Sequence, residues 1–210
     1  MKQKKSDLPR KPRVPVHATP QSHEIRIIGG LWKRTKLTVA DKPGLRPTPD
    51  RVRETLFNWL GQDLTGWRCI DAFAGTGVLG FEAASRGAKE VTLVEQDSAL
   101  VAQLKRVQTQ LQASATQVVR GDGVAALKHV DAASMDAVFI DPPFDSTLFE
   151  AALQAAGRAV APDGFVYLEA PVRWTDEQLE LTGLKVARHL KAGAVHAHLL
   201  KRAASTDTTA

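Results

Sequence analysis

The feature that most restricts the fold is an alternation of short apolar stretches with helical stretches, which begins at residue 67. The apolar stretches predict strands over residues 68–73, 91–95, 117–120, 137–140, 165–169, 184–190 and 195–200. Helical spacing of apolar residues predicts helices over residues 78–86, 98–111, 124–130 and 148–160. Repeated strand–helix units predict an α/β fold with an open, mainly parallel seven-stranded sheet, helices on both faces and an antiparallel closing strand.

The N-terminal half carries a different pattern, typical of a small hairpin followed by a helix. Residues 25–28 and 36–39 predict two strands joined by a turn at Gly29-Gly30. A helix follows, with Thr48 as the expected N-cap and Pro49 at the first helical position. Apolar residues in that helix share one face, while Arg51 and Arg53 fall on other faces.

These patterns divide the chain into four parts. We expect a disordered basic arm over residues 1–24, an N-terminal extension of hairpin and helix over 25–65, a catalytic domain over 66–200 and a flexible tail over 201–210. No apolar run is long enough for a membrane helix, and the first 24 residues contain no stretch of signal-peptide type. We therefore expect a cytoplasmic protein.

Charge is distributed unevenly along the chain. Residues 1–53 hold 14 Lys and Arg against 4 Asp and Glu, whereas residues 54–210 hold 14 against 19. A basic N-terminal quarter on an acidic body predicts a polyanionic partner for that quarter. A merely solubilising tail explains residues 1–13 equally well, but explains residues 26–53 less well, because the basic residues there lie in foldable sequence.

Cysteine and histidine usage argues against a disulfide scaffold and against a metal centre. The single cysteine, Cys69, lies in a predicted core strand and has no partner for an intramolecular disulfide. His196 and His198 alternate on one face of the last predicted strand, without a cysteine or a carboxylate pair nearby in the sequence. We expect no metal.

A glycine-rich segment follows the first strand of the alternating region and opens a helix. Residues 75–80 fit the pattern GxGxxG, which alone is compatible with a dinucleotide. Glu95 ends the next strand, 20 residues after Gly75, where a carboxylate can bind both hydroxyls of a ribose. Asp71 and Asp122 add negative charge, which suits the cationic S-adenosyl-L-methionine and would repel a pyrophosphate. Asp122 also fits a simple turn in Gly-Asp-Gly.

The segment from Asp141 to Phe144, Asp-Pro-Pro-Phe, follows the fourth strand, at the sheet edge where α/β proteins bind ligands. A carboxylate from Asp141 and the carbonyl of Pro142 can accept hydrogen bonds from an exocyclic amine and aim its lone pair at a methyl group. The prolines stiffen the loop, and Phe144 offers a face on which a base can stack. A base inside a duplex is unreachable, so the target must be unpaired or flipped out.

These residues resemble the Rossmann-like methyltransferases that use S-adenosyl-L-methionine to modify exocyclic amines. RIIGG at 26–30, Trp32, LRPT at 45–48 and DRVRETLFNWL at 50–60 look like the bacterial RsmD family, which methylates N2 of guanine 966 in 16S ribosomal RNA. The resemblance covers roughly residues 25–200. The chain departs from it at Arg34, where that family usually has a glycine.

The resemblance implies a role for each motif. Cofactor contacts are expected from Asp71, Phe73, Gly75, Gly77, Glu95 and Asp122. The catalytic residues are expected to be Asp141, Pro142 and Phe144. RNA contacts are expected from Arg26, Lys33, Arg34, Lys36, Arg46, Arg51 and Arg53. The implied partner is 16S RNA within the small ribosomal subunit or its assembly intermediate, and we expect a monomer.

Three alternatives remain open on the sequence. An adenine-N6 or protein-glutamine methyltransferase would use the same cofactor, although those groups more often have Asn in place of Asp141. An RNA-binding assembly factor would keep the fold without the chemistry. A dehydrogenase fits the glycine pattern but not the acidic pocket or the Asp-Pro-Pro-Phe segment.

Overall fold

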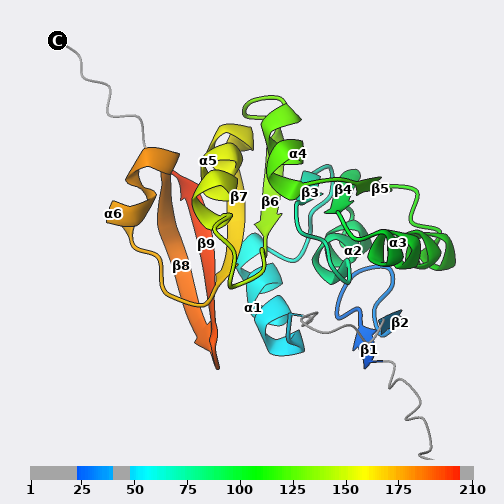
Figure 1. The fold of residues 1–210 in the computed structure, drawn as a ribbon. Coiled ribbons are helices and arrows are strands. Elements are labelled where there is room, and N and C mark those ends of the chain that lie inside the picture. The colour runs from blue at the N-terminus through cyan, green and yellow to red at the C-terminus, as the bar shows by residue number, and fades with distance from the viewer. Residues whose placement is uncertain (1–22, 40–47, 204–210) are drawn as a thin grey trace, which may run out of the picture.

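The computed structural model describes residues 23–39 and 48–203, so Arg46 and most of the predicted arm and tail lie outside the described residues. One sheet has seven strands in the order β5-β4-β3-β6-β7-β9-β8 (Figure 1). The strands are β3 (Arg68–Asp71), β4 (Glu90–Glu95), β5 (Thr116–Arg120), β6 (Met135–Ile140), β7 (Val160–Ala170), β8 (Leu184–Ala192) and β9 (Val195–Arg202). The pairs from β5 to β7 are parallel, and β9 runs antiparallel to both β7 and β8. The predicted fold class is confirmed.

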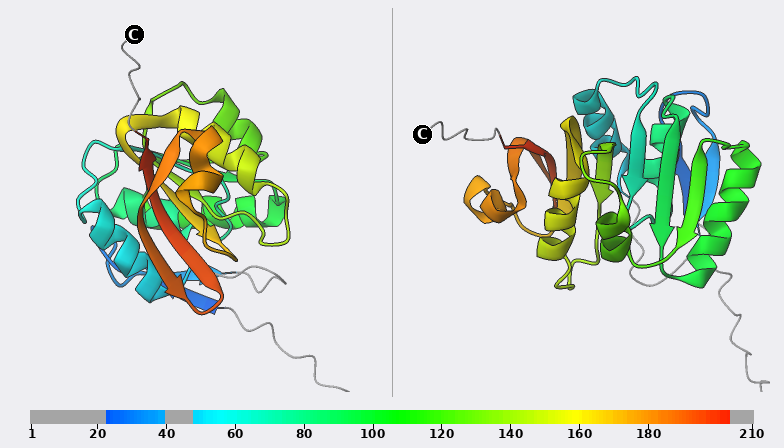
Figure 2. Two further views of the ribbon diagram at one scale, coloured as in Figure 1. Left: turned by 90° about the vertical axis from the view of Figure 1, so that its left-hand side faces the viewer. Right: turned by 90° about the horizontal axis from the view of Figure 1, so that it is seen from above.

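Helices cover both faces of this sheet (Figure 2). They are α1 (Asp50–Leu60), α2 (Val78–Ser85), α3 (Ser98–Leu111), α4 (Gly123–His129), α5 (Phe149–Ala159), α6 (Asp176–Leu179) and the short 3-10 helix η1 (Glu180–Thr182). The sequence analysis missed α6 and η1, because one turn is too short to show a period. A capping box between Thr175 and Gln178 starts α6.

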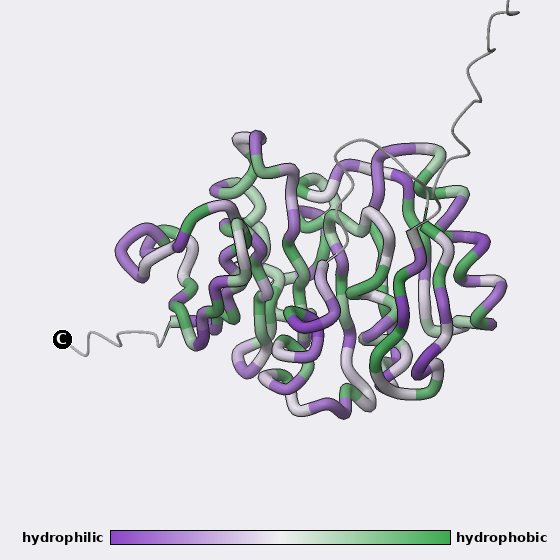
Figure 3. Tube along the Cα trace, turned by 90° about the horizontal axis from the view of Figure 1, so that it is seen from below, coloured by the Kyte–Doolittle hydropathy of each residue, from purple (hydrophilic) through white to green (hydrophobic). Residues whose placement is uncertain are grey.

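The buried side chains form two clusters, one on each face of the sheet. One cluster joins α1, α2 and α3 to the sheet through residues such as Leu56, Phe81 and Leu104. The other joins α4 and α5 to the opposite face through residues such as Leu127 and Leu153. Figure 3 shows hydrophobic stretches along the inner strands and hydrophilic residues on the outer turns. The central strands are therefore covered on both sides, as their apolar composition requires.

A separate two-stranded sheet, β1 (His23–Arg26) and β2 (Lys36–Val39), forms the predicted hairpin. Its turn lies over residues 30–33 and not at Gly29-Gly30, because Ile27 still pairs with Thr35 and Arg34. Gly30 has φ +70° and lies against α2, where a Cβ atom would stand 1.8 Å from the Ser85 carbonyl oxygen. The glycine thus allows the turn to contact α2 closely.

Helix α1 begins one residue later than predicted, and its N-cap is Pro49. Thr48 therefore does not cap the helix. Its side chain is buried and bonds the Glu169 carboxylate instead. The proline at the cap position has extended backbone angles, φ −58° and ψ 146°, which its ring favours.

A buried ion pair connects the hairpin to α1 and α2. The guanidinium of Arg53 donates to the Glu82 carboxylate at 2.7 Å, and both side chains have no exposed surface. Arg53 also donates to the carbonyl oxygens of Thr48 and Arg26 and to the Asp50 carboxylate. The prediction that Arg53 contacts RNA is therefore wrong for this structure, because every contact of its buried guanidinium is internal.

We predict that Arg53→Met destabilises the protein by about 3 kcal/mol, because the buried Glu82 carboxylate loses its hydrogen-bonded guanidinium and keeps only Arg86, at 3.5 Å. Arg51→Met is the matched control, since Arg51 lies on the same helix but is exposed, and we expect it to change stability by less than about 0.5 kcal/mol. Urea unfolding of both variants measures the difference. Equal midpoints would show that the ion pair contributes nothing.

Arg34 has φ 72°, in the left-handed region that favours glycine. We predict that Arg34→Gly is more stable than Arg34→Ala by about 1 kcal/mol, because both variants lose the side chain and only glycine relieves the backbone. Thermal unfolding of the two variants provides the comparison. An alanine variant as stable as the glycine variant would contradict it.

Candidate active site

Four carboxylates come together at one edge of the sheet because they end parallel strands. Asp71 ends β3, Glu95 ends β4, Asp141 follows β6 and Glu169 lies one residue before the end of β7. The strands pair in register, with Asp71 opposite Leu93 and Phe139. Carboxyl ends of parallel strands form the ligand-binding edge of such a sheet, so this edge is the candidate active site.

The glycine loop is held in place by two of these carboxylates. The amide N–H of Gly75 donates to Glu95 Oε2 at 3.0 Å, and that of Gly80 donates to Asp71 Oδ2 at 3.2 Å. Gly77 has φ +77°, and a Cβ atom there would stand 2.3 Å from Leu104 Cδ2. The loop can therefore follow this path only with glycine at position 77.

Burial changes the charge state of Asp71. Its carboxylate is almost completely buried, and desolvation raises its pKa to about 7, against the opposing hydrogen bond from Gly80. A cation placed beside it would favour the ionised form and lower this pKa again. The Asp71 and Glu95 carboxylates at the glycine loop thus fit a positively charged ligand.

The loop after β6 places the second group of predicted residues. Burial, followed by the nearby Glu169 and Asp71 carboxylates, raises the pKa of Asp141 well above its usual range. Pro142 is buried, whereas the Phe144 side chain is 38% exposed. The Ser146 N–H donates to the Pro143 carbonyl oxygen at 2.9 Å, which closes a turn beneath this exposed ring. The aromatic face is therefore accessible at the same edge as the Asp141 carboxylate.

Glu169 is a site residue that the sequence analysis missed. The carboxylate is 3% exposed, accepts a hydrogen bond from the Tyr167 hydroxyl at 2.8 Å and another from the Thr48 hydroxyl. Desolvation raises its pKa, while these two hydrogen bonds oppose the rise. The signal was present, because Glu169 ends a predicted strand just as Glu95 does. Through Thr48, the N-terminal extension reaches the catalytic edge.

Asp122 and Phe73 lie next to one another at this edge. Asp122 is exposed and caps α4, since Oδ1 accepts from the Ala125 N–H at 2.7 Å. Gly123 packs against the backbone of Ala72, where a Cβ atom would stand 2.0 Å from the carbonyl oxygen, and against the Phe73 ring. The Gly-Asp-Gly segment therefore has the structural role of a helix cap, and a ligand contact from Asp122 stays a prediction.

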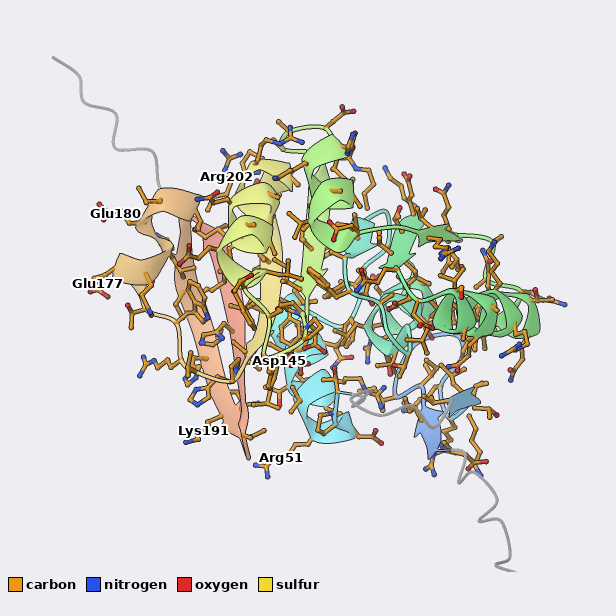
Figure 4. All side chains as sticks on the ribbon, in the orientation of Figure 1. Arg51, Asp145, Glu177, Glu180, Lys191 and Arg202 are labelled. Atoms are coloured by element: carbon orange, nitrogen blue, oxygen red, sulfur yellow. The ribbon has the colours of Figure 1, made fainter. Side chains whose placement is uncertain are left out.

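The residues predicted to contact RNA occupy two places. Arg26, Lys33, Arg34 and Lys36 are exposed on the hairpin, and Lys36 pairs with Glu24 at 2.7 Å. Arg51 is exposed at the start of α1 and, with Asp145 of the catalytic loop, lies toward the lower edge in Figure 4. The exposed cations thus lie on the extension that contributes Thr48 to the site.

No helix within the described residues is long and apolar enough to cross a membrane. No group of three or more His, Cys, Asp or Glu side chains within residues 23–39 and 48–203 is arranged to hold a metal ion.

The sequence matches the family described as Conserved hypothetical protein 95 over residues 25–201. It is 43% identical to ribosomal RNA small subunit methyltransferase D of Escherichia coli K12 over 153 residues, which cover 72% of this chain and 77% of the relative. The chain belongs to the RsmD family. The Haemophilus influenzae member is 41% identical over 174 residues, covering 77% of this chain and 90% of that one.

Two solved structures have the same fold as this chain and are related to it in sequence. The structure of Escherichia coli yhhF superposes with a TM-score of 0.74 at 35% identity and covers 86% of this chain and 98% of that chain. Haemophilus influenzae HI0767 superposes with a TM-score of 0.69 at 34% identity, with 86% and 99% covered. The resemblance found in the sequence is confirmed, and the roles of the individual site residues stay predictions.

Proposed function

We propose that this chain transfers a methyl group from S-adenosyl-L-methionine to the exocyclic N2 of a guanine in 16S ribosomal RNA. Family membership supports the reaction, since the related proteins are named small subunit ribosomal RNA methyltransferases. The observation that carries the proposal is the position of Asp141, a half-buried carboxylate near the buried Asp71 and Glu169 carboxylates and three residues before the exposed Phe144 ring. By resemblance the target is guanine 966. The substrate is the small subunit or its assembly intermediate in the cytoplasm.

The acidic edge provides the binding site for the cosubstrate. When bound, S-adenosyl-L-methionine supplies an electrophilic methyl group on a sulfonium. The Glu95 carboxylate is placed to accept hydrogen bonds from a ribose while it orders the loop through Gly75. Asp71 lies next to the loop, where its negative charge favours an ammonium or sulfonium ligand. Phe73, Gly77 and Asp122 complete the proposed cofactor contacts.

The catalytic loop prepares the amine for direct in-line transfer. Asp141 and the Pro142 carbonyl oxygen accept the two N–H groups, so the nitrogen lone pair is directed away from the ring plane. With S-adenosyl-L-methionine held by the glycine loop and Glu95, this lone pair would face the methyl group that the cosubstrate supplies. The extra proton on nitrogen then passes to Asp141 and on to water. Phe144 stacks on the extruded base.

The N-terminal extension, residues 25–65, is proposed to dock on RNA through its exposed cations, and Arg46 belongs to this prediction although it lies outside the described residues. The protein is proposed to act as a monomer. Phosphate contacts by these side chains would make binding weaken steeply as salt rises.

The function is tested with methyl-labelled S-adenosyl-L-methionine and small subunits from cells that lack the enzyme. Digestion of the RNA should yield labelled N2-methylguanosine. Label on adenine or on a protein glutamine would assign the alternative substrates. Cofactor binding without any label transfer would indicate a binding protein.

We predict that Asp141→Ala lowers kcat by at least about 100-fold, because the amine loses the acceptor that orients it. Cofactor affinity, measured by calorimetry, should change less than about threefold, since we place Asp141 against the amine and not the ribose. Loss of cofactor binding in this variant would move Asp141 into the cofactor site.

Glu169 controls the protonation of Asp141, because it is a neighbouring negative group in a buried site. We predict that kcat rises with pH as Asp141 loses its proton, and that Glu169→Gln shifts this rise to lower pH. The sign follows because removal of a like charge lowers the pKa of Asp141. A pH profile of single-turnover transfer measures the shift. Tyr167→Phe removes a hydrogen bond that favours the ionised Glu169 carboxylate, so it should shift the rise in the same direction by a smaller amount. If the rise of kcat with pH in Glu169→Gln stays in place or moves to higher pH, Glu169 does not raise the pKa of Asp141.

A further inference from the structure

Three histidines and two other basic residues gather on the β8–β9 ribbon, in a cluster that the proposed mechanism does not use. We call Arg173, His189, Lys191, His196 and His198 the histidine patch. Antiparallel register places His189 opposite His198 and Lys191 opposite His196, so these four side chains share one sheet face. The three imidazole centroids are 4.8–6.4 Å apart. Arg173 comes from the loop after β7 and lies close enough to lower the pKa of both His189 and His198.

The patch lies level with the catalytic loop. Ile140, the residue before Asp141, pairs with Leu168, Leu168 pairs with His198, and His198 pairs with His189. Three strand spacings separate Ile140 from His189, which is about 14 Å. Figure 4 shows Lys191 at the lower end of β8, toward the same edge as Asp145 and Arg51.

The cations of the patch have no acidic partner in the part of the chain that the structure describes. None of the ion pairs within residues 23–39 and 48–203 involves Arg173, Lys191 or the three histidines. The acidic Glu177 and Glu180 lie toward the upper end of β8 in Figure 4, whereas Lys191 lies at its lower end. Like charges gathered without a counter-ion favour an anion at this surface.

Hydrogen bonds connect two of the histidines to each other and the third to the backbone. The Trp174 N–H donates to His198 Nε2 at 3.1 Å, which places the His198 proton on Nδ1. His189 Nε2 and His196 Nδ1 share one hydrogen bond at 3.0 Å, so one donates and the other accepts. Burial is the largest cause that lowers the pKa of His198, to about 4, and the nearby His189 is the second largest. An anion could accept a hydrogen bond from the half-exposed rings of His189 and His196. The buried His198 could stay neutral when that anion binds.

We propose that the histidine patch is a second RNA-binding surface, which holds backbone phosphates next to the target guanine. The inference rests on the proposed function and adds a surface to it. In Figure 1 the β1–β2 hairpin and the β8–β9 ribbon lie on opposite sides of β6 and β7. RNA held at both surfaces spans the catalytic edge, and the target base is presented between them. Arg173 and Lys191 supply the charge, while His189 and His196 donate hydrogen bonds.

The test compares two lysines on the same strand. Lys191→Ala removes a charge at the catalytic edge, and Lys185→Ala removes one from an exposed lysine at the other end of β8. We expect Lys191→Ala to raise KM for small subunits about fivefold with kcat unchanged, and to reduce the slope of log KM against log salt by about 1. Arg173→Ala should behave in the same way, and Lys185→Ala should match the unmodified protein.

Two results would overturn the inference. One is an equal KM and salt slope for Lys191→Ala and Lys185→Ala. The other is a defect of Lys191→Ala that is present with the assembled subunit but absent in filter binding to protein-free 16S RNA, which would assign the patch to a ribosomal protein. Unmodified protein is measured in parallel. If it transfers no methyl group to the subunit, the proposed function fails. If it is active while the two lysine variants agree, only the second surface fails.

Discussion

The buried pair between Arg53 and Glu82 is the contact on which the arrangement of the N-terminal extension depends. One carboxylate on α2 binds the α1 guanidinium and also accepts from the Ile28 N–H of the hairpin segment. Without Glu82, the Arg53 guanidinium would lose its only fully buried carboxylate partner, and without Arg53 the Glu82 carboxylate would keep only Arg86, at 3.5 Å. The hairpin, α1 and α2 are therefore held as one body. Since α2 begins directly after the glycine loop, the N-terminal extension and the proposed cofactor site both contact this helix.

The catalytic edge depends on a different balance, between burial and charge. Glu169 lies close enough to oppose the ionisation of both Asp71 and Asp141, and Asp71 also opposes the ionisation of Asp141. Desolvation is the largest cause of the raised pKa at all three positions. Such a site favours a cationic ligand and a substrate that donates hydrogen bonds. The same negative charge would repel the pyrophosphate of a dinucleotide. The GxGxxG pattern is compatible with a dinucleotide, so the neighbouring carboxylates were needed to distinguish the two kinds of cofactor.

The main sheet could be predicted because its strands and helices differ in period and its loops contain glycine and proline. The residues that were misplaced are those whose environment depends on distant segments. Arg53 looked exposed because it lies off the apolar face of α1, yet the hairpin covers that side and supplies the Arg26 carbonyl oxygen. Thr48 looked like a cap, but Glu169 lies within reach of its hydroxyl only after β7 is in place. Local pattern contains no information on either contact.

The hydrogen bond between Thr48 and Glu169 joins the N-terminal extension to the candidate active site. Thr48 lies two residues before α1, whose exposed Arg51 is proposed to contact RNA, and Glu169 lies close enough to Asp141 to raise its pKa. A change in this hydrogen bond would change the pKa of Glu169 and, through the charge on Glu169, the pKa of Asp141. Tyr167 holds the same carboxylate from the sheet, and burial together with Glu169 keeps its hydroxyl protonated as a donor by raising its pKa. Glu169 is thus fixed to the sheet by Tyr167 while its second hydroxyl partner belongs to the N-terminal extension, so a single buried carboxylate connects the extension to the loop that carries Asp141.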